Sequence, residues 1–185
     1  MNTEIGSRPR KARKYGKYDH KKQIWFHTVK WFIGLVIIFV LLFRFVLGLS
    51  VIIGNSMENT LFDKDNVLYF RIHGDLARGD LVAAHLPDGE YNAKRVIAIA
   101  GDVVDLHDGV LYINGRPEEG DYILTPTLPE EAAFNYPYTV EKDTVFLLGD
   151  NRAQSKDSRF YGSVGINQVT GVIHARFGWL YLNLF

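Results

Sequence analysis

The 185-residue chain contains no cysteine. Disulfides therefore cannot stabilise its folded part, and hydrophobic packing has to do so. The sequence also lacks an internal repeat and a nucleophile-elbow motif G-x-S-x-G. Its six histidines are scattered, with no spacing that suggests metal ligands: His20, His27, His73, His85, His107 and His174. No metal site is predicted, whereas a Ser-His-Asp triad stays open because triads assemble across a fold.

Net charge is lacking as well, because 21 Lys and Arg balance 21 Asp and Glu. This neutrality hides two unlike regions. Residues 1–30 hold nine basic residues against two acidic ones, whereas residues 45–185 hold eleven basic and nineteen acidic residues. A basic tail is typical of proteins that bind nucleic acid or an anionic membrane surface. The segment that follows the tail decides between these two partners.

Charge is absent from residues 31–43, WFIGLVIIFVLLF. A membrane-spanning helix needs about 20 predominantly apolar residues, and two frames supply them, Ile24–Phe43 and Trp31–Ile53. Lys30 or Arg44 near a helix end can snorkel to the lipid headgroups. We therefore predict a lipid bilayer as partner and no nucleic acid.

The domain organisation follows from this span. We expect a basic, disordered tail over residues 1–23, a transmembrane anchor within residues 24–53 and a folded body over residues 54–185. The basic excess before the span places the N-terminus in the cytoplasm and the body outside. The alternative is a cleaved signal peptide, since Gly48-Leu49-Ser50 weakly matches a cleavage site. The apolar run is longer than the usual 7–15 residues of such peptides, so a retained anchor is favoured.

The body is predicted to be all-β, a barrel-like or sandwich core. No stretch of it shows a sustained 3.6-residue apolar period. Short runs rich in β-branched and aromatic residues, bounded by Gly, Asp, Asn or Pro, indicate strands instead. The proline-containing residues 117–139 are predicted to be a long excursion rather than core. The expected strands cover residues 66–72, 80–86, 93–100, 102–106, 109–114 and 143–149.

Two residues of the body stand out chemically. Ser56 follows the apolar run directly, and Lys94 lies within a strand pattern that places Asn92, Lys94 and Val96 on one face. A lysine there is commonly a residue that protects an edge strand from aggregation. If its face is buried, desolvation lowers its pKa. A neutral amine beside a serine hydroxyl can act as a general base, and serine–lysine pairs are a known variant of serine activation.

Four segments resemble a known family in their order and spacing. They are GNSMENTL (54–61), RGDLV (78–82), AKRVIAIAGDVV (93–104) and GDNRAQSKDSRFYGSVG (149–165). The chain resembles bacterial type I signal peptidases, in particular the shorter Gram-positive type. These are single-pass proteases of the plasma membrane that remove signal peptides from exported proteins. The resemblance covers the anchor and most of residues 50–175.

The resemblance implies roles for individual residues. Ser56 is expected to be the nucleophile, with its backbone N–H in the oxyanion hole. Lys94 is expected to be the general base, and the Ser155 hydroxyl to help orient it. No cofactor is implied. Four charged residues are expected to brace the site from behind: Asp157, Arg159, Asp150 and Arg95.

The sequence departs from the family pattern at several positions. Asn59 and Ala100 stand where prolines are usual, which is expected to cost backbone rigidity rather than chemistry. Asn92 replaces a tyrosine that is common two residues before the lysine. Gly54 stands where some members have a serine that completes the oxyanion hole, so the second donor stays unassigned.

The predicted function is therefore membrane-bound serine endopeptidase activity that cuts after small residues through an acyl-enzyme. The expected substrate is the signal-peptide region of exported preproteins, bound as an added β-strand. Two alternatives stay open. One is a processing protease dedicated to a narrow client, such as a pilus or surface-protein precursor. The other is a non-catalytic assembly factor that binds secreted chains.

Overall fold

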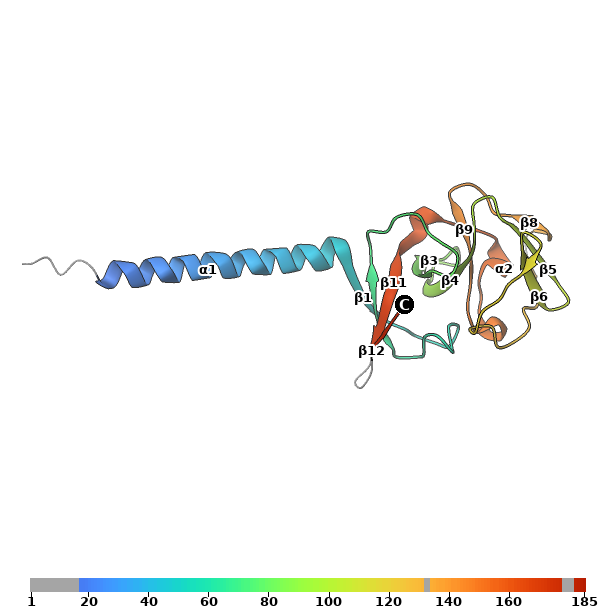
Figure 1. Cartoon of the computed structure of the whole chain (residues 1–185), viewed down its shortest axis with the longest axis horizontal. Helices are drawn as coiled ribbons and strands as arrows, with labels where there is room; N and C mark the ends of the chain where they lie inside the picture. Colours follow the sequence, from blue (N-terminus) through green and yellow to red (C-terminus); the bar gives the residue numbers. More distant parts are fainter. Residues whose placement is uncertain (1–16, 132–133, 178–181) are drawn as a thin grey trace, which may run out of the picture. The chain divides into compact units, whose positions relative to one another are not determined.

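The computed structural model describes residues 17–131, 134–177 and 182–185. The chain divides into two units, residues 1–42 and 43–185. The first is helical and the second, the body, is mostly β-sheet (Figure 1). The predicted fold class, one apolar helix before an all-β body, is confirmed.

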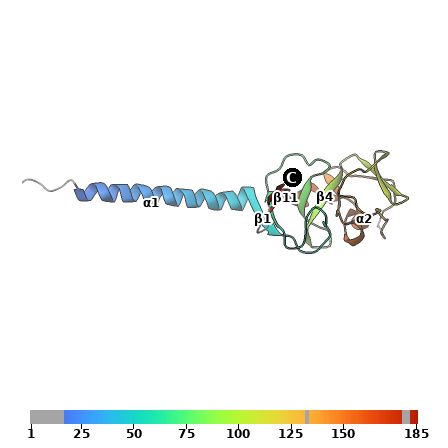
Figure 2. The ribbon, with the colours of Figure 1, turned by 60° about the horizontal axis from the view of Figure 1, so that its bottom comes forward.

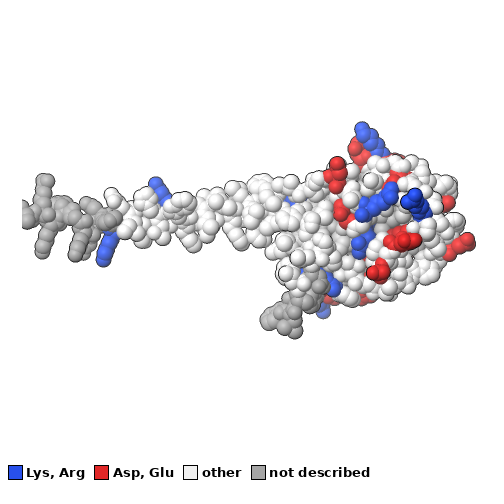
Figure 3. All heavy atoms as spheres, in the orientation of Figure 1, with Lys and Arg blue, Asp and Glu red and all other residues white. Residues whose placement is uncertain are grey.

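The first unit contains helix α1 (Lys17–Leu41), which is followed by the π-helical turn η1 (Leu42–Val46). Together they include a segment, Lys21–Val46, that is long and apolar enough to cross a membrane. Its apolar side chains are exposed. Most of α1 is white in Figure 3, because few of its residues are charged. A helix that is apolar all round and not buried in protein fits a lipid environment.

The prediction of a disordered tail is wrong for its last residues. Residues 17–23 form the first turns of α1, because no glycine or proline precedes Gly34 in this helix and propagation from a long helix costs little. The rest of that prediction, residues 1–16, lies outside the described residues.

The helical frame Trp31–Ile53 is also wrong, because its last residues form strand β1 (Leu47–Val51). This strand pairs antiparallel with β2 (Asn66–Phe70), from Leu47 opposite Phe70 to Val51 opposite Asn66. A Cβ at Gly48 would overlap the Tyr69 ring, so this small residue serves close packing within the sheet. Cleavage after Gly48-Leu49-Ser50 would break this strand. The body therefore begins before residue 54.

The body contains two antiparallel sheets. The larger one curls into a half-barrel in the order β1-β2-β11-β3-β4-β9-β10, with β12 paired to β11. The smaller sheet has the order β7-β6-β5-β8. In Figures 1 and 2 the β1–β11 side and the small sheet lie at opposite ends of the body, with β4 between them. The remaining strands are β3 (Leu81–His85), β4 (Tyr91–Ile99), β5 (Val103–His107), β6 (Val110–Ile113), β7 (Arg116–Pro117), β8 (Tyr138–Thr139), β9 (Thr144–Leu148), β10 (Val164–Gly165), β11 (Val169–Phe177) and β12 (Leu182–Leu184).

All six predicted strands are present, as β2, β3, β4, β5, β6 and β9. The long strand β11 was not predicted, although it pairs with both β2 and β3. Gly171 interrupts its apolar pattern, and a Cβ there would meet the Phe70 carbonyl of β2. This glycine is required by close strand packing and not by a turn. Three short helical segments complete the body: η2 (Arg152–Gln154), α2 (Ser158–Tyr161) and η3 (Ile166–Gln168).

The excursion predicted over residues 117–139 is mostly irregular, since only its ends belong to β7 and β8 among the described residues. It nevertheless contributes to packing. Its aromatic side chains lie against the core cluster between β4, β9 and the small sheet, through Tyr122, Phe134, Tyr136 and Tyr138. It covers the core, and the description as an excursion apart from the core is only partly right.

Strand β4 does not keep the simple alternation that its sequence predicts. A bulge between Val96 and Ala98 shifts its register against β9. Val96 therefore packs in one core cluster, whereas Ile97 and Ala98 both pack in another. Because Lys94 is 2% exposed, it does not project from an exposed sheet edge, and the interpretation of Lys94 as an edge-protecting residue is wrong.

Candidate active site

Lys94 is held inside the large sheet. It pairs with Val82 of β3 and is 2% exposed. Its Nζ donates a hydrogen bond of 2.9 Å to the Ser155 hydroxyl. Burial lowers the pKa of Lys94 from its ordinary value, and the negative charge of Asp157 partly opposes this change. The arrangement favours a neutral amine that keeps a lone pair for a proton.

Ser56 lies on the loop that follows β1 and is half-buried. The next residue, Met57, is 1% exposed and packs in a core cluster with Leu61. The Ser56 carbonyl accepts a hydrogen bond of 3.1 Å from the backbone N–H of Asn151. Within the described residues the backbone N–H of Ser56 has no acceptor. The loop is thus held by its backbone and by Met57, while the hydroxyl lines a groove.

Gly149 lies close to both the Ser56 loop and Ser155, the hydrogen-bond partner of Lys94. A Cβ at this position would lie against the Ser155 hydroxyl and 2.5 Å from the Ser56 carbonyl oxygen. The segment that begins at Gly149 therefore contacts Lys94 through Ser155 and Ser56 through Asn151. The structure brings the serine loop and the lysine strand together around one short segment.

Asp157 and Arg159 stabilise this segment from the inside. Arg159 Nε donates a hydrogen bond of 2.9 Å to Asp157 Oδ1, and both side chains are at most 1% exposed. Arg159 Nη2 also donates to the carbonyl of Ser155 at 3.1 Å, while Asp157 accepts from the N–H of Gly149 at 3.1 Å. These bonds fix both ends of the turn that carries Ser155. The bracing role of Asp157 and Arg159 stays a prediction.

Arg95 and the buried Asp150 form a second ion pair on the other face of β4. Arg95 donates two hydrogen bonds to the Asp150 carboxylate, from Nε at 2.8 Å and from Nη2 at 2.7 Å. Thr60, at the end of the serine loop, donates to the same carboxylate. The Arg95 guanidinium lies 4.0 Å from the centroid of the Tyr122 ring. This pair ties the serine loop to β4.

Sequence reasoning missed Arg152, although it lies within the GDNR segment. Its side chain is fully buried and donates two hydrogen bonds of 2.7 Å to Glu118. Its Nε donates to the Gly149 carbonyl at 3.0 Å. Arginine is rarely buried without a partner, but the partner comes from the excursion 117–139, which no local pattern connects to this segment.

Asn59 has a positive φ of 86°. Proline is locked near −65° and cannot adopt this conformation. The interpretation of Asn59 as a lost stiffening proline is therefore wrong, because a proline would not fit this loop. At Gly54 the backbone N–H donates to Asp63 Oδ1 at 2.9 Å, so this group is already engaged.

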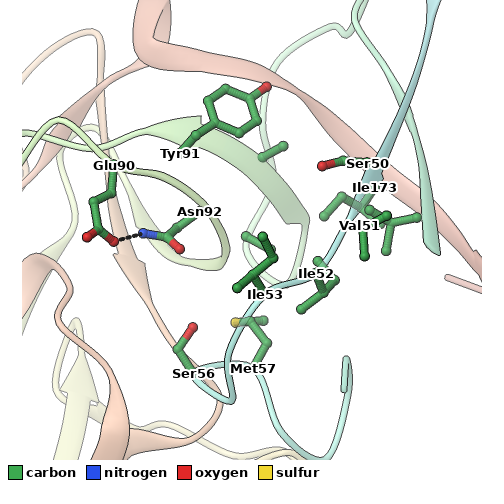
Figure 4. A pocket seen from close by; sticks show the side chains of 13 residues that line it. Ser50, Val51, Ile52, Ile53, Ser56, Met57, Glu90, Tyr91, Asn92 and Ile173 are labelled. Atoms are coloured by element: carbon green, nitrogen blue, oxygen red, sulfur yellow. Dashed lines mark hydrogen bonds between the residues drawn. The ribbon is translucent and has the colours of Figure 1, made fainter. Parts of the chain in front are cut away.

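A groove with a volume of about 390 Å³ opens beside Ser56 (Figure 4). Its apolar wall includes Ile52, Ile53 and Met57, and its opposite wall is formed by residues 90–93 at the start of β4. Tyr91 to Ala93 pair with β3 on one side, whereas β9 begins to pair with β4 only at Arg95. Among the described residues, the second edge of this short stretch has no strand partner. The groove thus offers backbone groups to an extended chain.

No group of three or more His, Cys, Asp or Glu within the described ranges is arranged to hold a metal ion.

Residues 25–179 match the protein family described as signal peptidase, peptidase S26. Signal peptidase IB of Staphylococcus aureus strain Mu50 is 31% identical over 170 residues, which cover 80% of this chain and 88% of that protein. Signal peptidase I of Bacillus caldolyticus is 30% identical over 161 residues, with coverages of 80% and 87%. A crystal structure of a signal peptidase I from Enterococcus faecalis V583 is 32% identical, with a TM-score of 0.48, and covers 55% of this chain and 98% of that one.

Proposed function

Since the chain belongs to the signal peptidase family, peptidase S26, we infer that it is a serine endopeptidase that removes signal peptides from exported proteins. We assign the chemistry to Ser56 as nucleophile and Lys94 as general base. The observation that carries this assignment is the burial of Lys94 next to the segment that also holds the Ser56 loop.

Each reacting group has a defined task. Neutral Lys94 takes the proton of the Ser56 hydroxyl, and the serine oxygen attacks the scissile carbonyl. The backbone N–H of Ser56 donates to the oxygen that becomes negative in the tetrahedral intermediate. The protonated Lys94 then gives its proton to the leaving amine. An acyl-enzyme remains, and water activated by Lys94 hydrolyses it.

Ser155 acts as a positioning residue in this scheme. Its hydroxyl accepts one N–H of Lys94, and this bond restricts the rotation of the amine so that its lone pair is available to Ser56. The network of Asp157, Arg159 and Arg152 fixes the backbone that carries Ser155.

The substrate enters the groove as an extended segment. Residues 91–93 offer an unpaired strand edge, and a peptide added there gains main-chain hydrogen bonds. The groove beside Ser56 has a volume of about 390 Å³. Cleavage after small residues follows from the resemblance to signal peptidases.

The anchor keeps the site at the membrane surface. We place Lys21–Val46 across the bilayer, with the N-terminus in the cytoplasm, because residues 1–30 carry nine basic residues. The cut site of a signal peptide emerges just beyond its own apolar helix. Ser56 follows the span by ten residues, and its tether therefore holds it near that depth.

The decisive test compares purified full-length wild type, Ser56→Ala and Lys94→Met in detergent micelles. With a preprotein substrate, both variants should lose at least about 10³-fold in kcat/KM. Lys94→Met should unfold at the same temperature as wild type or higher, because an apolar side chain replaces a buried amine. An acylating serine probe should label wild type at Ser56.

Cleavage retained in both variants would disprove the assignment of the dyad. A folded wild type that neither cleaves preprotein nor reacts with the probe would instead indicate a protein that binds secreted chains without cutting them.

A further inference from the structure

The wall of the groove opposite Ile52 and Ile53 carries a negative charge. Glu90 precedes β4, is exposed and lines the same groove as Ser56 (Figure 4). Its backbone is fixed, because its carbonyl accepts from the N–H of Leu86 at 2.8 Å and its own N–H donates to Asp88 at 3.1 Å. These bonds fix the point at which the Glu90 side chain leaves the backbone.

The Glu90 carboxylate has a neutral partner only. Its Oε2 accepts a hydrogen bond of 3.1 Å from the amide of Asn92, which also lines the groove. Within the described residues no Lys, Arg or His forms an ion pair with Glu90. Lys94 does not form an ion pair with Glu90 in the proposed mechanism either, because Lys94 is neutral when it accepts the serine proton.

Three other carboxylates around the site each have a cationic partner. Asp157 is paired with Arg159, and Asp150 with Arg95. Asp88, on the same turn as Glu90, lies 3.6 Å from the Lys156 ammonium. Glu90 differs from these three in lining the groove without a cationic partner. A cation on a bound substrate would be its first counter-charge.

We propose that Glu90 makes the groove prefer substrates that carry a lysine or arginine side chain a few residues from the scissile bond. This proposal rests on the proposed function and specifies its substrate. Asn92 is a positioning residue, because its amide holds the carboxylate toward the groove.

Strand geometry limits where the basic residue lies. Glu90, Asn92 and Lys94 alternate along the chain, and a rise of about 3.3 Å per residue puts Glu90 about 13 Å from Lys94. Because the Glu90 carboxylate reaches back to Asn92, its charge lies between two and four residues from Lys94. A substrate strand beside β4 has the same repeat. Its basic side chain is therefore two to four residues from the bond next to Lys94.

The test uses internally quenched peptides that span a signal-peptide cleavage junction. Six positions are varied, namely those two, three and four residues from the cut on each side. Each peptide carries Lys, Gln or Glu at one of these positions. The measured quantity is the ratio of kcat/KM for Lys and Glu peptides within each enzyme. This ratio cancels any change in Lys94, whose pKa Glu90 also raises through its charge.

We expect wild type to favour Lys over Glu about two- to five-fold at one or more positions at low salt. The ratio should decline at high salt, because salt screens exposed charges. Glu90→Gln should bring it to about one, and Glu90→Lys should invert it. The matched control Glu141→Gln removes an exposed carboxylate of the turn before β9, which does not line the groove, and should keep the wild-type ratio.

A wild-type ratio near one at every position, or a preference that persists in Glu90→Gln, would overturn the proposal. The Gln peptides separate this failure from a failure of the function itself. If wild type cleaves them and Ser56→Ala does not, the protease assignment stands and only the role of Glu90 is rejected. If wild type cleaves no peptide of the series, both are rejected.

Discussion

Ser56 and Lys94 contact the same short segment but are held in opposite ways. Lys94 belongs to strand β4 of the large sheet and is 2% exposed, with Val82 of β3 as its strand partner and Ser155 bonded to its amine. Ser56 belongs to a loop after the edge strand β1 and is half-buried. Its loop is held mainly through a backbone hydrogen bond from Asn151 and through the buried Met57.

The difference reflects what the two groups have to do. A lysine loses its proton at moderate pH only when it is removed from water, and this requires a rigid, buried site. A nucleophile has to be reached by a bulky peptide, so it must lie at the surface of a groove. The large sheet meets the first need and the loop after β1 meets the second. Gly149 lies against both regions, since a Cβ there would meet the Ser155 hydroxyl and the Ser56 carbonyl.

The strongest way to break this arrangement is Gly149→Ala. The added methyl group would push on the Ser155 hydroxyl and on the Ser56 carbonyl at once. We expect kcat/KM to decrease at least about 100-fold, since small misplacements of reacting groups have such effects. The free energy of unfolding should decrease by about 1–3 kcal/mol.

Gly74→Ala is the matched control for this substitution, because a Cβ there has no neighbour within 4 Å. It should leave preprotein cleavage and the denaturation midpoint unchanged. A Gly149→Ala enzyme with normal kcat/KM would show that the two regions do not depend on this contact.

Substitutions at Asn59 test the loop that carries Ser56 and leave the surroundings of Lys94 unchanged. Asn59→Pro should lower the free energy of unfolding by more than about 1 kcal/mol, because proline cannot adopt a φ of 86°. Asn59→Gly, which fits this φ, should stay within about 0.5 kcal/mol of wild type. Urea unfolding of the full chain in micelles measures both. Equal stability of the proline variant would contradict the loop conformation described above.

A substitution at Asp88 tests the surroundings of Lys94, and we expect it to have the smallest effect of these changes. Its negative charge raises the pKa of Lys94, so Asp88→Asn should lower that pKa further. Because the neutral amine is the active form, kcat/KM increases as pH rises through the pKa of Lys94. The acidic limb of the pH profile should therefore move to lower pH.

The matched control here is Asp143→Asn, an exposed position with an 81% exposed side chain. It should leave the pH profile in place. A limb that moves to higher pH in Asp88→Asn would be incompatible with Lys94 as the titrating base.

Short-range patterns were enough for much of this protein. An uncharged run of the right length predicts the anchor, because lipid selects for composition and length. Six strands follow from their β-branched residues and bounding turns. The four family segments point to Ser56, Lys94 and Ser155 because the chemistry needs these residue types at these places. The roles themselves remain predictions until the variants are measured.

Long-range contacts decided the rest. Residues 47–51, LGLSV, continue the largely apolar run that forms α1, and pairing with β2 makes them a strand. Lys94 is buried where its strand pairs with β3 and its amine meets Ser155, 61 residues further along the chain. The partner of Arg152 lies 34 residues away, on the excursion that was expected to stay apart from the core. Burial and pairing depend on which segments meet, and only the tertiary structure determines this.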